Sequence, residues 1–257
     1  MNRQKMNEDG KIPFTAHMEE LRRRLIVCII AVGVGFFISN GFKEKIFEIL
    51  AKPLVEAMGK GEKLIFTGLA EAFFIYLKVS FLAGLMLAAP VILYEFWMFV
   101  APGLYKNERR VLFPIIFLSA FFFVGGALFG YYIVFPFGFK FFLDFASESI
   151  RPLPSMREYF RFSSILLLSF GAVFELPIII VFLARLGIVT VDFLKKNRKY
   201  AILLIFIIAA VLTPTPDVIT QMLMAVPLMG LYEISIIGAK IFGKKKLTKE
   251  ENEEGKD

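Results

Sequence analysis

Side chains that could carry out covalent chemistry are scarce in this sequence. Its 257 residues contain one histidine, His17, and one cysteine, Cys28. The motifs of zinc proteases, serine hydrolases and phosphate-binding loops are absent, so the sequence predicts neither an activated nucleophile nor a metal site. A single cysteine also excludes a disulfide framework. We therefore predict that the protein is not an enzyme, has no catalytic residues, and binds no metal or other cofactor.

Carboxylates within or beside apolar segments are more informative. Glu175 lies inside a long apolar run, two residues before Pro177. A charged group at the centre of a bilayer costs about 2.5–3.5 kcal/mol on insertion scales, so such residues are seldom kept without a use. Two interpretations stay open: a functional carboxylate that faces a cavity, or a buried partner for an intramembrane donor such as Gln221. Asp217 precedes Gln221 by one helical turn, where it could also serve as a helix N-cap.

Two further glutamates lie among basic residues. Glu20 is four residues before Arg24, a spacing that favours an ion pair on one helix face, and Glu19 has the same relation to Arg23. Glu108 is surrounded by the positive charges of Lys106, Arg109 and Arg110. From spacing alone, Glu20 is best explained as a helix-surface ion pair and Glu108 as an ordinary loop carboxylate.

Long apolar runs must position these residues. Apolar residues make up 57% of the chain, against about 45–50% in typical soluble domains, and a membrane-spanning helix needs about 20 in succession. We predict an all-α integral membrane protein with six transmembrane helices, of which the last two are short. The predicted spans are residues 25–42, 72–100, 111–139, 162–184, 200–213 and 218–232. The last two are about 22 Å long at 1.5 Å per residue, too short for an ordinary bilayer.

The positive charges predict the orientation of these spans. With the N-terminus in the cytoplasm, 20 of the 30 Lys and Arg residues fall on the cytoplasmic side and nine on the other, in agreement with the positive-inside rule. Both termini are then cytoplasmic. No nucleic-acid binding is predicted, because basic and aromatic residues are not interleaved. We expect residues 1–240 to form one membrane domain and residues 241–257 a disordered cytoplasmic tail.

Four segments carry more specific motifs. They are His17–Ile26, Ala89–Arg110, Phe170–Pro177 and Thr213–Gln221. In this order they resemble the TatC family, the receptor subunit of the twin-arginine protein translocase, and the resemblance extends over about residues 13–240. One departure is Thr-Pro-Thr-Pro-Asp at residues 213–217, where the shorter Thr-Pro-Pro-Asp is the familiar form.

The resemblance implies roles for particular residues. Glu20 and Glu108 match the glutamates that receive the paired arginines of a signal peptide. The residues implied in signal-peptide binding are Glu20, Glu108, Arg22 and Phe99. The residues implied in partner contact, or as functional polar or proline positions, are Glu175, Asp217, Gln221 and Pro53.

The resemblance also implies a setting and partners. It implies a multi-pass protein of the prokaryotic cytoplasmic (inner) membrane that binds twin-arginine signal peptides of folded proteins. In the lipid bilayer it would associate with itself and with single-span TatA-like and TatB-like subunits, for export driven by the proton gradient. Arginine suits such recognition because its planar guanidinium forms paired hydrogen bonds with carboxylates. The main alternative is a small secondary transporter with Glu175 as its proton site, although a single clear midplane charge and no visible repeat argue against it.

Overall fold

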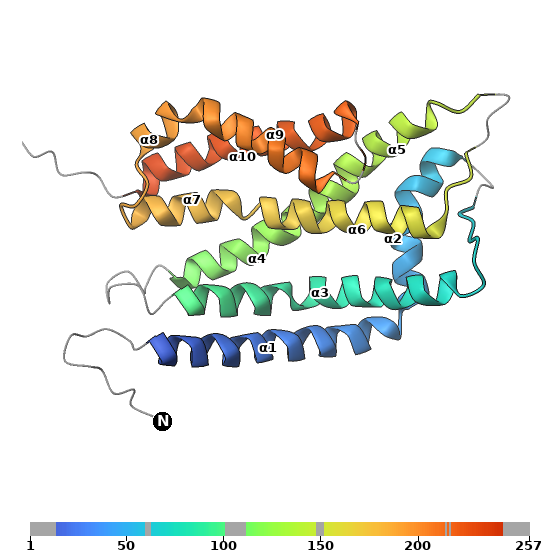
Figure 1. Ribbon diagram of the computed structural model, residues 1–257, viewed down its shortest axis with the longest axis horizontal. Coiled ribbons are helices and arrows are strands. Elements are labelled where there is room, and N and C mark those ends of the chain that lie inside the picture. Colours follow the sequence, from blue (N-terminus) through green and yellow to red (C-terminus); the bar gives the residue numbers. More distant parts are fainter. Residues whose placement is uncertain are drawn as a thin grey trace, which may run out of the picture. The chain divides into compact units, whose positions relative to one another are not determined.

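The chain is helical throughout the part that the structure describes. The computed structural model describes residues 14–59, 63–100, 112–147, 152–213, 215 and 217–243. Apart from short connections, these ranges form helices, and an isolated β-bridge joins Ile65 to Ser155. Figure 1 shows the helices α1 (Phe14–Asn40), α2 (Lys43–Met58), α3 (Glu71–Val100), α4 (Leu112–Phe129), α5 (Phe135–Leu143), α6 (Met156–Val173), α7 (Leu176–Arg185), α8 (Val191–Lys196), α9 (Arg198–Leu212) and α10 (Val218–Phe242). A π-helical turn, Gly130–Val134, joins α4 to α5.

Four helical stretches of the described residues are long and apolar enough to cross a bilayer. They are Glu71–Val100, Leu112–Leu143, Met156–Arg185 and Val218–Phe242. Helices α1 and α2 meet at an angle of 87°, and the count rises to five when this bent pair is taken as one span. The prediction of an all-helical, multi-pass membrane protein is therefore confirmed.

Some helix boundaries differ from the prediction. Helix α9 is short, with 15 residues, but α10 has 25 residues and continues to Phe242, so the prediction of a short last helix is wrong. The predicted end at Tyr232 came from the charge of Glu233. That carboxylate lies on an exposed face and accepts a hydrogen bond from Arg198 Nη2 at 2.7 Å, so α10 continues past it. Helix α2 was not predicted, because its apolar residues recur on one face only. Buried positions on that face are Phe47, Leu50, Ala51 and Leu54.

The described helices divide into two compact units. Unit 1 comprises residues 1–52, 63–121 and 153–160, and so contains α1 and α3. Unit 2 comprises residues 53–62, 122–152 and 161–257, and so contains α7 to α10.

In unit 1, α1 packs along α3 through a contact between two glycines (Figure 1). A Cβ atom built on Gly35 would lie 2.5 Å from the backbone oxygen of Gly84, and one built on Gly84 would lie 2.5 Å from the backbone nitrogen of Phe36. Only glycine fits at either position. Close backbone approach through small residues is the usual way to hold membrane helices together, because lipid removes most of the hydrophobic driving force.

The start of α3 is held by a buried carboxylate. Glu71 Oε2 accepts hydrogen bonds from the backbone nitrogens of Thr67 and Gly68, at 2.8 and 3.1 Å, and from the Thr67 hydroxyl at 3.1 Å. Its other oxygen, Oε1, accepts one from Arg157 N at 3.1 Å. The connection before α3 is thereby joined to the start of α6, beside the bridge between Ile65 and Ser155.

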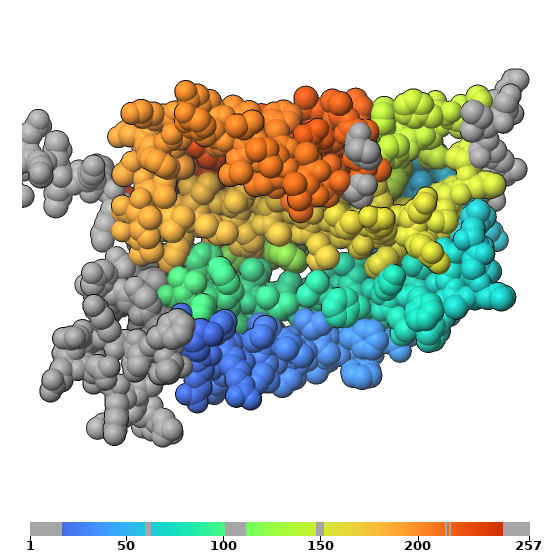
Figure 2. All heavy atoms as spheres, viewed as in Figure 1, coloured from blue at the N-terminus to red at the C-terminus, as the bar shows by residue number. Residues whose placement is uncertain are grey.

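In unit 2, α10 packs against α7 and α9. In Figure 2 the orange atoms of α8 and α9 lie on the visible face of this unit. Helix α6 ends at Val173 and α7 begins at Leu176, because Pro177 has no N–H to donate to the carbonyl of Val173, four residues earlier, and its ring crowds that carbonyl. A cluster of aromatic rings packs between the helices. Its members in contact include Phe129, Phe135, Phe139, Phe162, Phe170 and Phe174.

Candidate functional site

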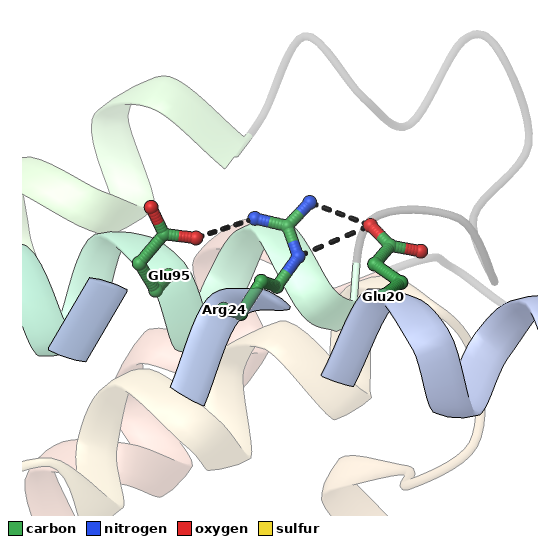
Figure 3. Close-up of polar contacts among 3 residues, drawn as sticks. All are labelled: Glu20, Arg24 and Glu95. Atoms are coloured by element: carbon green, nitrogen blue, oxygen red, sulfur yellow. Dashed lines mark hydrogen bonds and ion pairs between the residues drawn. The ribbon is translucent and has the colours of Figure 1, made fainter. Parts of the chain in front are cut away.

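Three charged side chains form an ion cluster between α1 and α3 (Figure 3). Arg24 donates from Nη2, at 2.6 Å, and from Nε, at 3.1 Å, to the same oxygen of Glu20, Oε1. It also donates from Nη1 to Glu95 Oε2 at 2.7 Å. The side chains of Glu20 and Arg24 are 19% exposed and that of Glu95 is 14% exposed. The ion cluster, defined as Glu20, Arg24 and Glu95, therefore holds one guanidinium between two carboxylates and carries a net charge of about −1 at neutral pH.

Helix periodicity explains why these residues meet. Glu20 and Arg24 are one turn apart on α1, so they share a face. Arg24 lies 11 residues before Gly35, and Glu95 lies 11 residues after Gly84. Eleven residues are just over three full turns, so each charge lies on the same face of its helix as the glycine and about 16 Å from it. The glycine contact between two antiparallel helices therefore sets the position of the ion cluster.

An aromatic contact lies at the same end of the α1–α3 interface as the ion cluster. The rings of His17 and Phe99 stack with centroids 4.3 Å apart and an angle of 19° between their planes. His17 is three residues before Glu20, and Phe99 is four residues after Glu95, so this stacked pair lies about one turn beyond the ion cluster. The structure therefore brings Phe99 into the same region as Glu20, as expected if both serve one site.

The other predicted signal-peptide residues lie apart from this pair. Arg22 is exposed on α1, and its spacing of two residues from Glu20 turns it toward a different helix face. Glu108 lies outside the described residues, as do all residues from 101 to 111. The predicted pair of Glu20 and Arg24 is present, whereas Glu19 and Arg23 are both exposed and form no ion pair with each other.

Sequence reasoning assigned no role to Glu95. The signal was present, because Glu95 is an ionisable residue within the apolar run that became α3. What the sequence could not provide was the partner, since Arg24 is 71 residues away along the chain. Identifying that partner requires the pairing of α1 with α3.

The residues predicted to contact partner subunits include two that shape the hairpin of α9 and α10. Asp217 caps α10: its Oδ1 accepts hydrogen bonds from Thr220 N at 2.7 Å and from the Thr220 hydroxyl at 2.8 Å. Burial alone would raise the pKa of Asp217, but hydrogen bonds from nearby groups, among them Thr220, hold the pKa below its ordinary value. Gln221 Nε2 donates to the backbone oxygen of Phe206 on α9 at 3.1 Å, so this amide joins the two helices.

The remaining predicted residues are buried at helix irregularities. Glu175 is 7% exposed and lies at the junction of α6 and α7. The side-chain amide of Gln221, proposed as its donor, has the Phe206 oxygen as its acceptor instead. Pro53 is buried within α2. Among the described residues, no group of three or more His, Cys, Asp or Glu side chains could hold a metal ion.

An apolar groove opens one turn from Arg24. It has a volume of about 520 Å³ and lies between α1 and α3 within unit 1. Its lining includes Cys28, Val32 and Phe36 from α1 and Phe81 and Leu85 from α3. Cys28 follows Arg24 by four residues, so the groove continues from the ion cluster along the same side of α1.

Comparison with known proteins gives a consistent result. A family-wide sequence model described as Sec-independent protein translocase protein (TatC) matches residues 16–227. The TatC protein of Desulforapulum autotrophicum is 62% identical over 244 residues, which are 95% of this chain and 90% of that protein. The TatC protein of Escherichia coli K12 is 38% identical, over 96% of this chain and 95% of that protein. A crystal structure of the twin-arginine translocase receptor TatC matches with a TM-score of 0.78 and 42% identity, and the match covers 88% of this chain and 99% of that one.

Fold and comparisons together define a helical multi-pass membrane protein of the transport class. The chain belongs to the TatC family. It is therefore the receptor subunit of a twin-arginine, or Sec-independent, protein translocase, and not an enzyme. The resemblance seen in four sequence segments is confirmed, and a secondary transporter is no longer supported.

Proposed function

We propose that this protein binds the twin-arginine signal peptides of folded proteins, with Glu20 as one receiving carboxylate and Glu108 as the other. The observation that carries the proposal is the guanidinium already bound in the ion cluster. Arg24 shows that the Glu20 carboxylate accepts two donors of one guanidinium, at 2.6 and 3.1 Å. A signal-peptide arginine presents the same planar group.

The energetics require more than the two carboxylates. Hydrogen bonds to charged groups contribute about 1.5–3 kcal/mol when buried, and less at a site that is partly exposed. Two such contacts give only modest affinity, so the apolar segment of the signal peptide supplies the remainder. The apolar groove beside Cys28 offers surface for that segment, directly next to the carboxylates that would hold its charged end. Phe99 and Arg22 complete the proposed binding region.

We place the site at the cytoplasmic face of a prokaryotic cytoplasmic membrane. In this proposal the chain crosses the membrane six times, has both termini in the cytoplasm, and ends in a tail that begins after α10, at Phe242 and not at residue 240. Residues 244–257 of that tail lie outside the described residues. The excess of Lys and Arg on the proposed cytoplasmic side supports this orientation. Cysteine labelling of intact cells tests it: a cysteine at Lys63 should react from outside, and one at Lys240 only after the membrane is opened.

The partners in this proposal are single-span TatA-like and TatB-like subunits. We assign their contacts to the hairpin of α9 and α10, where Asp217 and Gln221 lie, with Glu175 and Pro53 as further functional positions. The support is the long row of exposed apolar side chains on α9, which a second membrane helix could cover. This row consists of Ile202, Leu203, Leu204, Ile207 and Val211.

Peptide binding tests the receptor role. A fluorescent peptide with Arg-Arg before an apolar run should bind the purified protein in detergent more tightly than its Lys-Lys counterpart. Glu20→Gln and Glu108→Gln should each weaken Arg-Arg binding about fivefold or more, which corresponds to about 1 kcal/mol. Glu19→Gln is the matched control, because Glu19 is exposed on the same helix. Equal binding of both peptides, or no loss in Glu20→Gln, would refute the proposal.

A further inference from the structure

We propose that Arg24 is a built-in competitor of the signal-peptide arginine, and that it sets the affinity of Glu20 for that arginine. This inference rests on the proposed function of Glu20. Arg24 makes the contacts that an incoming guanidinium would make: Nε and Nη2 both donate to Glu20 Oε1, at 3.1 and 2.6 Å. In the structure the receiving carboxylate is therefore already occupied by a guanidinium of its own chain.

Occupation by Arg24 lowers the apparent affinity for a peptide. A ligand binds only the fraction of molecules in which its site is available, so the measured dissociation constant rises as that fraction falls. Arg24 and Glu20 are both only 19% exposed, so water screens their contact less than it would a surface ion pair. The guanidinium must leave, or share the carboxylate, before a signal arginine can make its own pair of hydrogen bonds.

Glu95 makes this exchange feasible. A partly buried cation that loses its only partner is strongly destabilised. Arg24 has a second partner, because its Nη1 donates to Glu95 Oε2 at 2.7 Å. When a peptide takes Glu20, Arg24 stays paired with Glu95 on α3. Glu95 is thus a positioning residue that holds the displaced guanidinium without touching the peptide.

The competition leaves the preference for arginine over lysine unchanged. Displacing Arg24 costs the same free energy for both peptides, so the ratio of their dissociation constants does not depend on the fraction of available sites. The preference comes from Glu20 itself, because a planar guanidinium pairs with the carboxylate through two donors, whereas a lysine ammonium is a strongly hydrated point charge.

Removing Arg24 tests the competition directly. In full-length protein in detergent, Arg24→Met should bind the Arg-Arg peptide about fivefold more tightly, and the Lys-Lys peptide should gain by the same factor. Arg24→Lys should lie between the wild type and Arg24→Met in affinity. Arg23→Met is the matched control: it removes the same charge from an exposed neighbour and should change affinity less than about twofold.

A double-mutant cycle separates the role of Glu95 from direct contact with the peptide. Glu95→Gln should weaken Arg-Arg binding about threefold or more in the wild type, because Arg24 then stays on Glu20. In the Arg24→Met background, the same change should have no effect. A peptide contact by Glu95, or a purely structural role, would instead weaken binding in both backgrounds, and this would overturn the inference.

The outcomes also distinguish this inference from the proposed function. If wild-type binding depends on Glu20 but Arg24→Met binds the Arg-Arg peptide equally or more weakly, the receptor role stands and the competition is refuted. If wild-type binding does not depend on Glu20, both are refuted. Tighter binding of the Arg-Arg peptide in Arg24→Met, with no effect of Glu95→Gln in that background, supports both.

Discussion

The contact between Gly35 and Gly84 allows a quantitative prediction. In Gly35→Ala, the new Cβ would lie 2.5 Å from the backbone oxygen of Gly84 and 3.0 Å from its Cα. An ordinary contact begins near 3.4 Å, so the helices must separate by about 0.9 Å, and backbone atoms of α3 cannot yield as a side chain would. Overpacking of this kind costs about 1–3 kcal/mol, or roughly 2–12 °C of melting temperature for a protein of this size.

The separation would also reach the ion cluster, three helical turns away. A rigid displacement of 0.9 Å would lengthen the bond from Arg24 Nη1 to Glu95 Oε2 from 2.7 Å to about 3.6 Å, beyond the range of a hydrogen bond. Gly35→Ala should therefore lower both the melting temperature and the binding of an Arg-Arg peptide. The peptide effect follows because Arg24 loses Glu95 and stays on Glu20.

The assay has a built-in probe and a matched control. Trp97 is the only tryptophan of the sequence, and it is buried with its indole nitrogen donating to Ser119 Oγ at 2.8 Å, so its emission reports unfolding of unit 1. Gly33→Ala is the same change two residues earlier on α1, where a Cβ would meet nothing within 4 Å. Its free energy of unfolding should be unchanged, or higher by about 0.5–1 kcal/mol from the gain in helix propensity. It is a control for the melting temperature alone, because Gly33 also lines the apolar groove. Equal melting temperatures for Gly35→Ala and Gly33→Ala would refute the reasoning.

Three further predictions concern the ends of the helices. Asp217→Ala should destabilise the α9–α10 hairpin by about 0.5–2 kcal/mol through loss of the cap on Thr220. Because folding lowers the pKa of Asp217, its stabilisation should be complete at neutral pH and be lost only below about pH 4 in acid melts; a loss near pH 6 would contradict this. Glu71→Gln should lower the melting temperature, because the two carboxylate oxygens of Glu71 together accept four hydrogen bonds and an amide nitrogen, which cannot accept, would replace one of them. An unchanged melting temperature would contradict this role of Glu71. The ion pair between Arg198 and Glu233 is about half exposed. Arg198→Ala should therefore change the free energy of unfolding by less than about 1 kcal/mol in thermal melts, and a larger loss would contradict the surface character of the pair.

Apolar patterning predicted most helices because lipid requires unbroken apolar runs. Helix α3 was predicted as residues 72–100 and begins at Glu71, because no charge interrupts the centre of the run. The hairpin before α10 was also predicted, since the prolines at 214 and 216 cannot lie within a helix and Asp217 is a strong N-cap residue. Helix α10 was misjudged because hydropathy treats Glu233 as a stop, whereas its ion pair lets the helix continue.

The site was predictable only in part. The pair of Glu20 and Arg24 follows from a spacing of four, which is local information. The pairing of Arg24 with Glu95 depends on which two helices pack together and in which direction. The glycines at 35 and 84 determine this, but nothing local marks them as partners among 19 glycines. The hydrogen bonds of Glu71 were not predicted for the same reason, since the Arg157 nitrogen that donates to its carboxylate is 86 residues away along the chain.

The order of synthesis gives the ion cluster a further consequence. His17, Glu20, Arg24, Glu95 and Phe99 all lie within the first 100 residues, and α1 and α3 need only each other to bring these side chains together. At about 5–20 residues per second, the ribosome needs roughly another 8–30 s to finish the chain. The ion cluster between α1 and α3 can therefore form while the α9–α10 hairpin does not yet exist, before the proposed partner-binding helices have been made.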